Sequence, residues 1–157
     1  MADRPTDDDF LERLKIRDLL ERYCYGHDMH DYDLVATCFT PDVRASYLNG
    51  AAKASNRDDF MKVMQSPAAF EFAYQAHNTA HAHIVVDGDS ATADSLCVIV
   101  LAQGEAGHDA LIRGARYLDR LRRENGEWRI CEREHRSLWE AVAPENALRF
   151  PPAARQA

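Results

Sequence analysis

Hydrophobic positions in the first half of the chain recur at helical spacing. Thr6 offers a capping hydroxyl ahead of three aspartates, so a helix should begin there and run to about residue 28. Gly26 weakens that helix near its end. Further helices are predicted at 31–39 and 57–65, with a turn at 40–42 and a short strand at 43–48. The side chains on the apolar stripe of the first helix are Leu14, Ile16, Leu19, Leu20, Tyr23, Cys24 and His27.

The second half changes to long apolar and alternating runs that are separated by turn signals. Asp87-Gly88-Asp89 and Asn125-Gly126 are typical of tight hairpin turns. Four long antiparallel strands are expected, with a looser connection near 103–109 and a polar tail from residue 141: 74–86, 90–102, 111–124 and 127–139. Helices followed by a strand meander predict an α+β domain, with the helices on one face of a bent sheet.

Composition and charge exclude several classes of protein. With 157 residues, 46% hydrophobic and 29% charged, the chain is expected to form one globular domain over 1–157. A net charge of −7 with interleaved acids and bases speaks against nucleic-acid binding. No apolar run approaches the roughly 20 residues of a membrane helix. The acidic start MADRPTDDDF is unlike a secretory signal, so we expect a cytoplasmic location.

The cysteines favour a structural interpretation. They are scattered, each lies in an apolar context, and no CxxC pair is present, so neither a zinc site nor a disulfide framework is expected. We predict buried free thiols at Cys24, Cys38, Cys97 and Cys131.

Several local phrases, taken in order, resemble the SnoaL-like branch of the nuclear-transport-factor-like superfamily, and the resemblance covers about residues 8–140. It implies a cone-shaped barrel, in which a strongly bent antiparallel sheet wraps a deep pocket closed by the first helices. The phrases are IRDLLERY (16–23), DMHDYD (28–33), FTPD (39–42), a histidine at 77, VDGDSA (86–91), GARYLDR (114–120) and NGEWRI (125–130).

The resemblance also implies a catalytic site. Scytalone dehydratase, bile-acid dehydratase and hexachlorocyclohexane dehydrochlorinase pair an aspartate after the first helix with a histidine on a strand, and the matching positions are Asp28 and His77. Tyr23 falls where individual members of this group carry a tyrosine or a lysine. Tyr47 falls where one member carries a tyrosine, and Arg133 where one carries an arginine. The chain departs from scytalone dehydratase in having no histidine near Ser95 on the following strand and no asparagine near Tyr117.

A histidine backed by a carboxylate is suited to removing a proton from carbon. The carboxylate fixes the ring tautomer and stabilises the imidazolium that forms. Nothing local shows that Asp28 and His77 meet. The alternative is that Asp28 caps the next helix and His77 is an ordinary strand residue.

The strand that carries His77 contains a conflict. Ala82, Ile84 and Val86 should face inward, and strict alternation then turns His77, His81 and His83 outward. His77 reaches a pocket only if a β-bulge lies between it and Ala82. His77 and His81 lie roughly 13 Å apart along a strand, too far to hold one metal ion. We predict no metal site.

The remaining candidate residues each have a structural alternative. Tyr23, Tyr47 and Tyr117 either donate to a substrate oxygen or are simply core residues. Arg133 should share a face with Cys131 and His135, where it either stabilises developing negative charge or pairs with an acid such as Asp119. Asp119 is itself a candidate substrate-binding residue.

The sequence therefore predicts a cofactor-independent lyase or isomerase that acts on a small cyclic or polyketide-like molecule. No glycine-rich phosphate loop or GxSxG motif is present, and no cofactor is expected. The alternatives are a structural β subunit of a ring-hydroxylating dioxygenase and a ligand-binding protein without turnover. We also expect a homo-oligomer joined through the outer face of the sheet, near Trp128, Trp139, His81 and His83.

Overall fold

The helices come first and the long strands follow, as the sequence predicts. The computed structural model describes residues 7–66, 72, 74–102 and 109–144. No helix in these ranges is long and apolar enough to cross a membrane. The elements are α1 (Asp7–Asp28), α2 (Tyr32–Thr37), β1 (Phe39–Tyr47), the 3₁₀ turn η1 (Leu48–Gly50), β2 (Ala52–Ala54), α3 (Arg57–Met64), β3 (Tyr74–Asp87), β4 (Ser90–Ala102), β5 (Ala110–Glu124) and β6 (Glu127–Ala143).

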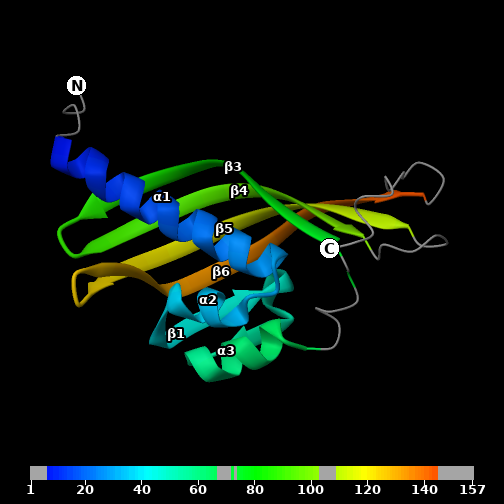
Figure 1. The fold of residues 1–157 in the computed structure, drawn as a ribbon, viewed down its shortest axis with the longest axis horizontal. Coiled ribbons are helices and arrows are strands. Elements are labelled where there is room, and N and C mark those ends of the chain that lie inside the picture. Colours follow the sequence, from blue (N-terminus) through cyan, green and yellow to red (C-terminus); the bar gives the residue numbers. More distant parts are fainter. Residues whose placement is uncertain (1–6, 67–71, 73, 103–108, 145–157) are drawn as a thin grey trace.

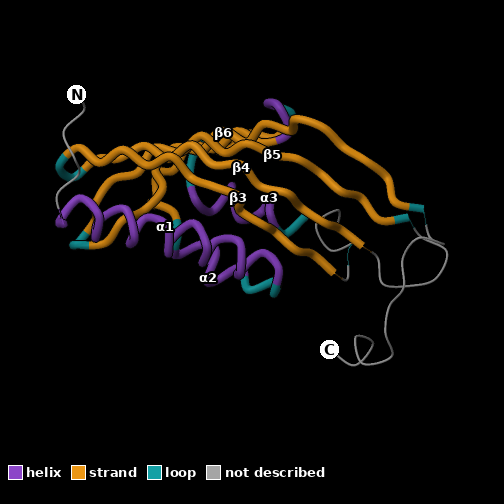
Figure 2. The backbone as a smooth tube through the Cα atoms, turned by 90° about the horizontal axis from the view of Figure 1, so that it is seen from above, coloured by secondary structure: helices purple, strands orange, loops and turns teal. Residues whose placement is uncertain are grey.

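The strands form one curled sheet in the order β2-β1-β6-β5-β4-β3. β1 runs parallel to β6, and the other neighbouring strands are antiparallel. The helix α1 crosses the sheet, while α2 and α3 lie beside β1 (Figure 1). Seen from above, the three helices lie on one side of the sheet (Figure 2). This is the α+β arrangement with segregated helices that the sequence indicates.

The end of α1 is fixed by a close approach of α2. Gly26 does not end the helix. A Cβ at Gly26 would lie only 2.8 Å from a methyl carbon of Val35 on α2, so glycine permits the contact. The chain then turns at His30, which has a positive φ of 55°, and the Asp31 N–H donates to the Gly26 carbonyl. Asp31 also caps α2 through the Leu34 N–H. This geometry holds Asp28 at the last position of α1.

β3 contains the bulge that the alternation conflict predicts. Its pairing with β4 shifts register between Thr79 and His81, which leaves Ala80 as the extra residue. Positions on both sides of the bulge therefore face inward: His77 and Thr79 before it, Ile84 after it. His81 and His83 are exposed, as expected.

A second bulge corrects the prediction for β6. Arg120 pairs with Glu132 but Leu121 pairs with Ile130, so Cys131 is the extra residue and does not share the inward face of Arg133 and His135. Its thiol is only partly buried and contacts the Arg120 carbonyl, which corrects the expectation of a buried thiol. The other three cysteines are buried and free, as predicted.

Two further expectations about the strands were wrong. The segment 40–42 is part of β1, because the register between β1 and β6 shifts between Phe39 and Arg44 and the strand can accommodate Pro41 there. β6 continues to Ala143, well past the predicted end at 139, since its pairing with β5 extends to Ala110. The predicted loose connection at 103–108 and the tail beyond residue 144 lie outside the described residues.

Trp128 does not lie on the outer face, contrary to prediction. It is buried on the inward face, where its Nε1–H donates to the Glu12 carboxylate of α1 at 2.6 Å. Trp139 does lie on the outer face, half exposed, and its ring covers Gly114 so closely that a Cβ there would be 2.3 Å away.

Candidate active site

A cavity of about 440 Å³ opens between the inward face of the sheet and the ends of α1 and α3. That volume suits a small organic molecule. One part of the wall is apolar and includes Met64, Ile99 and Leu101. The polar part brings together residues from α1 and four strands: Tyr23, His27, Tyr47, Gln75, His77, Arg113, Tyr117 and His135. The cavity therefore combines an apolar surface with several polar groups.

Asp28 lies behind this wall, in direct contact with the lining residue His77. The His77 Nδ1–H donates to Asp28 Oδ1 at 2.6 Å. The backbone N–H of His77 also donates to both carboxylate oxygens, at 3.1 and 3.0 Å. The His77 side chain is 7% exposed and that of Asp28 is 24% exposed. Because Nδ1 is the donor, the Nε2 of the neutral ring carries a lone pair, and no described residue donates to it.

Tyr23 and Tyr47 form a hydroxyl pair deeper in the cavity. Their oxygens are 2.9 Å apart, and Arg133 Nη1 approaches the Tyr47 oxygen at 3.5 Å. Burial raises the pKa of both phenols, and the guanidinium of Arg133 only partly opposes this. Both hydroxyls therefore stay protonated and can donate hydrogen bonds.

Arg133 and Asp119 face inward but lie behind the tyrosines. The guanidinium forms a bidentate pair with the Asp119 carboxylate, both bonds measuring 2.7 Å. The two side chains are 1% and 0% exposed. The charge also lies over the rings of Tyr23 at 4.1 Å and Tyr117 at 4.7 Å. The structure thus places Arg133 against the tyrosines, while the cavity wall itself contains neither Arg133 nor Asp119.

Two histidines that the sequence did not nominate also line the cavity. Burial lowers the pKa of His27 to about 3, and the positive charge of Arg133 adds to this effect. Its buried Nε2 has no partner among the described residues, and its ring lies 5.2 Å from that of His77. The second is His135, whose ring stacks on Tyr47. The available signals were the helical spacing of His27 with Tyr23 and the alternation of His135 with Arg133.

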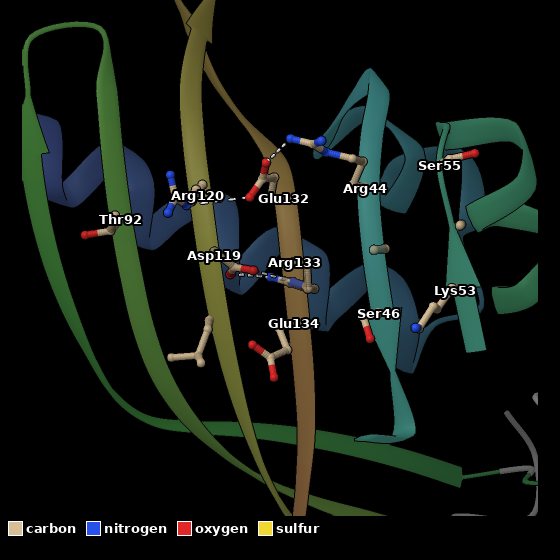
Figure 3. Close-up of a pocket in the computed structure, with 13 residues that line it drawn as sticks. Arg44, Ser46, Lys53, Ser55, Thr92, Asp119, Arg120, Glu132, Arg133 and Glu134 are labelled. Atoms are coloured by element: carbon tan, nitrogen blue, oxygen red, sulfur yellow. Dashed lines mark hydrogen bonds and ion pairs between the residues drawn. The ribbon is translucent and has the colours of Figure 1, made fainter. Parts of the chain in front are cut away.

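A larger depression lies elsewhere, on the outer face of the sheet, with a volume of about 920 Å³ (Figure 3). Its charged side chains largely neutralise one another, since Glu132 pairs with both Arg44 and Arg120. Helix α1 lies behind the sheet in this view, and the Asp28–His77 pair does not contribute to the depression. We therefore regard the smaller inner cavity as the candidate site.

The described part of the chain contains no group of three or more histidine, cysteine or acidic side chains arranged to hold a metal ion.

Comparison with known proteins gives one family match. Residues 8–134 match the model of the SnoaL-like domain. An uncharacterised protein of Mycobacterium tuberculosis, Rv2910c, is 28% identical over 124 residues, which cover 78% of this chain and 82% of the relative.

Solved structures show the same fold. A candidate scytalone dehydratase from Novosphingobium aromaticivorans superposes with a TM-score of 0.79 at 22% identity, covering 87% of this chain and 91% of that one. A hexachlorocyclohexane dehydrochlorinase, LinA-type3 from Novosphingobium barchaimii, gives 0.78 at 16% identity, covering 92% and 97%. At these identities the likeness extends to the fold alone.

Proposed function

Because the chain belongs to the SnoaL-like family, we propose that it is a cofactor-independent lyase or isomerase of the dehydratase type. The substrate is a small cyclic or polyketide-like molecule that fits the inner cavity. The observation that carries the proposal is the contact of Asp28 with His77, which lines the cavity and whose Nε2 receives no donor from the described residues.

In this proposal His77 Nε2 removes a proton from carbon. The resulting imidazolium is stabilised by the Asp28 carboxylate, which already holds the ring and the backbone of His77. In an elimination the same imidazolium returns the proton to the departing hydroxyl, so that water leaves and a carbon–carbon double bond remains. In an isomerisation the proton is returned to a different carbon.

The tyrosines bind the substrate and Arg133 positions them. Tyr23 and Tyr47 present a protonated hydroxyl pair, and Tyr117 packs beside Tyr23. Arg133 acts through Tyr47, with Asp119 holding the guanidinium in place. His27, whose Nε2 has no partner within the described residues, gains one when a polar ligand fills the cavity.

The same polar groups argue against one alternative. A structural β subunit of a ring-hydroxylating dioxygenase does not need a part-buried carboxylate–imidazole pair beside a His27 nitrogen that has no partner among the described residues. A buried polar atom without a partner reduces stability unless something binds to it.

A panel of small cyclic β-hydroxy ketones tests the function. The purified protein is incubated with each compound, and dehydration is followed by the loss of water in mass spectra and by the absorbance of the conjugated product. We expect turnover of at least one compound, equal turnover by the exposed-site control His83→Ala, and at least a hundredfold slower turnover by His77→Ala. Tight binding without turnover would instead indicate a binding protein, and copurification of a large iron protein would indicate the β-subunit alternative.

We also propose that the protein is a homo-oligomer joined through the outer face of the sheet. Trp139 is 50% exposed there, and His81 and His83 are exposed on β3. An exposed indole on the same face as a broad depression of paired charges favours association with a second copy. Light scattering at micromolar concentration should give at least a dimer mass, and a monomer mass would refute this.

A further inference from the structure

His135 occupies a fixed position in the cavity wall. It lies on β6, is 3% exposed, and stacks on Tyr47 with ring centroids 5.0 Å apart and an angle of 2° between the planes. On its other side the ring packs against Tyr117 at 5.2 Å. Two aromatic neighbours therefore prevent the imidazole from turning.

One hydrogen bond determines its tautomer. The backbone N–H of Leu48 in η1 donates to His135 Nδ1 at 3.2 Å. A backbone N–H can only donate, so Nδ1 must be the acceptor and the proton of the neutral ring is on Nε2. No hydrogen bond from Nε2 to another described residue is present, and the residue lines the cavity. A molecule in the cavity therefore meets an N–H donor.

The ring also stays neutral. Burial, then the charges of Arg133 and Arg113, lowers the pKa of His135 to about 4. The guanidiniums of Arg133 and Arg113 are thus the main charges that act on the ring. A neutral imidazole in this field is a good hydrogen-bond donor but a poor base.

His77 has the opposite tautomer. Asp28 accepts from its Nδ1–H, so its Nε2 accepts a proton, whereas the Nε2 of His135 donates. The two residues come from β3 and β6, with β4 and β5 between them in the sheet. One cavity thus holds a base and, separated from it by two strands, a fixed donor.

We propose that His135 is a further catalytic residue, whose Nε2–H binds a carbonyl oxygen of the substrate and stabilises the enolate that forms when His77 removes the neighbouring proton. This inference rests on the proposed function and defines its substrate class as carbonyl compounds. The C–H electron pair becomes the C=C bond of the enolate, and the carbonyl π electrons move to the oxygen held by His135. When hydroxide leaves from the next carbon it takes the proton from His77 as water, and the carbonyl is restored.

The tautomer and the donor can be tested without a substrate. The probe is 4-nitrophenol, whose phenolate resembles an enolate and whose absorbance reports ionisation. In ¹⁵N-histidine-labelled protein, His135 should show a protonated Nε2, and this proton should shift downfield when 4-nitrophenolate binds. His135→Phe keeps an aromatic ring on Tyr47 but removes the donor, and should weaken phenolate binding by about tenfold to a hundredfold. His135→Gln, which keeps an N–H donor, should bind within about threefold to fivefold of the wild type.

The control separates this inference from the proposed function. His77→Ala should still bind 4-nitrophenolate through His135, even though the base is gone. Equal phenolate affinity in wild type and His135→Phe would overturn the assignment of His135, whatever the His77 variant does. No phenolate binding by the wild type, or an Nε2 that is not protonated, would overturn it as well. Unchanged turnover in His77→Ala would instead refute His77 as the proposed base.

Discussion

Asp28 receives hydrogen bonds from both the ring and the backbone of His77, a residue 49 positions away in the chain. A carboxylate at the last position of a helix is disfavoured by the helix dipole. The hydrogen bonds from His77 offset this cost and couple the end of α1 to β3. The orientation of the imidazole is therefore set by the fold itself, before any ligand arrives.

Asp28→Asn should lower kcat by on the order of a hundredfold or more while the protein stays folded. The amide can still accept a hydrogen bond from the ring, but it cannot stabilise the imidazolium charge. Kinetics on the substrate found in the panel, together with thermal unfolding, measure both effects. The matched control is Asp31→Asn, which changes the same charge at the α2 cap and should leave kcat unchanged. Similar losses in the two variants would show that charge at the cavity is not the cause.

Deleting Ala80 should remove the bulge in β3. Six positions then separate His77 from Ile84, so regular alternation keeps both side chains on the inward face. Turnover should therefore stay near that of the wild type. ¹⁵N spectra should show the His77 ring still hydrogen-bonded to Asp28. A folded deletion variant that loses this hydrogen bond and its turnover would show that the bulge itself orients the base.

Replacing Arg133 alone should destabilise the protein strongly. Arg133→Ala leaves the Asp119 carboxylate, which is 0% exposed, without its cation, and should cost about 3–5 kcal/mol of unfolding free energy. The double variant Arg133→Met with Asp119→Leu should recover most of this loss, because both charges are then absent. Turnover should stay reduced in the double variant, since Tyr47 loses its cationic neighbour. Urea unfolding of the wild type, Arg133→Ala and the double variant measures these differences in stability. An Arg133→Ala protein as stable as the wild type would contradict the prediction.

Stability should fall in mild acid because two neutral histidines are buried. The ordinary histidine pKa of 6.5 applies to the unfolded chain, whereas His135 and His27 in the folded protein have pKa values of about 4 and about 3. Below pH 6.5 the unfolded state therefore binds more protons than the folded state. The stability that the two neutral histidines contribute is fully present above that pH and is lost as the pH falls. Each histidine adds a slope of up to about 1.4 kcal/mol per pH unit, down to its folded pKa.

Urea unfolding between pH 7 and pH 5 measures this slope. His27→Phe should remove one histidine's share of it and should not reduce stability at pH 7, because an unpartnered buried nitrogen is replaced by carbon. An unchanged slope in His27→Phe would mean that His27 is not buried in its neutral form.

The fold could be predicted from local signals that act over short distances. Acidic first turns, the Asn56 cap, and the two hairpin turns place most elements within a few residues of their observed bounds. Where prediction failed, a distant partner decided the outcome. Pro41 lies in a strand because β6 pairs with β1 on both sides of it, at Phe39 and at Arg44, and Trp128 turns inward because Glu12 of α1 binds its indole.

The features of the candidate site could likewise be predicted only where the signal was local. The bulge near Ala80 could be predicted because His77 and Ile84 make conflicting demands within one strand. The bulge at Cys131 left no such conflict in the sequence, so its effect on the β6 face was missed. His135 was missed because its tautomer depends on a backbone N–H from η1, which only the tertiary structure brings into contact.

The most direct test of His77 as the base measures the removal of the proton from carbon. In D₂O, the rate of deuterium incorporation at the carbon next to the carbonyl of a turned-over substrate is followed by NMR for wild type and for His77→Gln, with unfolding curves to show that both are folded. We predict that the variant exchanges about 10²–10⁴-fold more slowly. Equal exchange rates in the two folded proteins would contradict this prediction, because the proton would then be taken by a group other than His77.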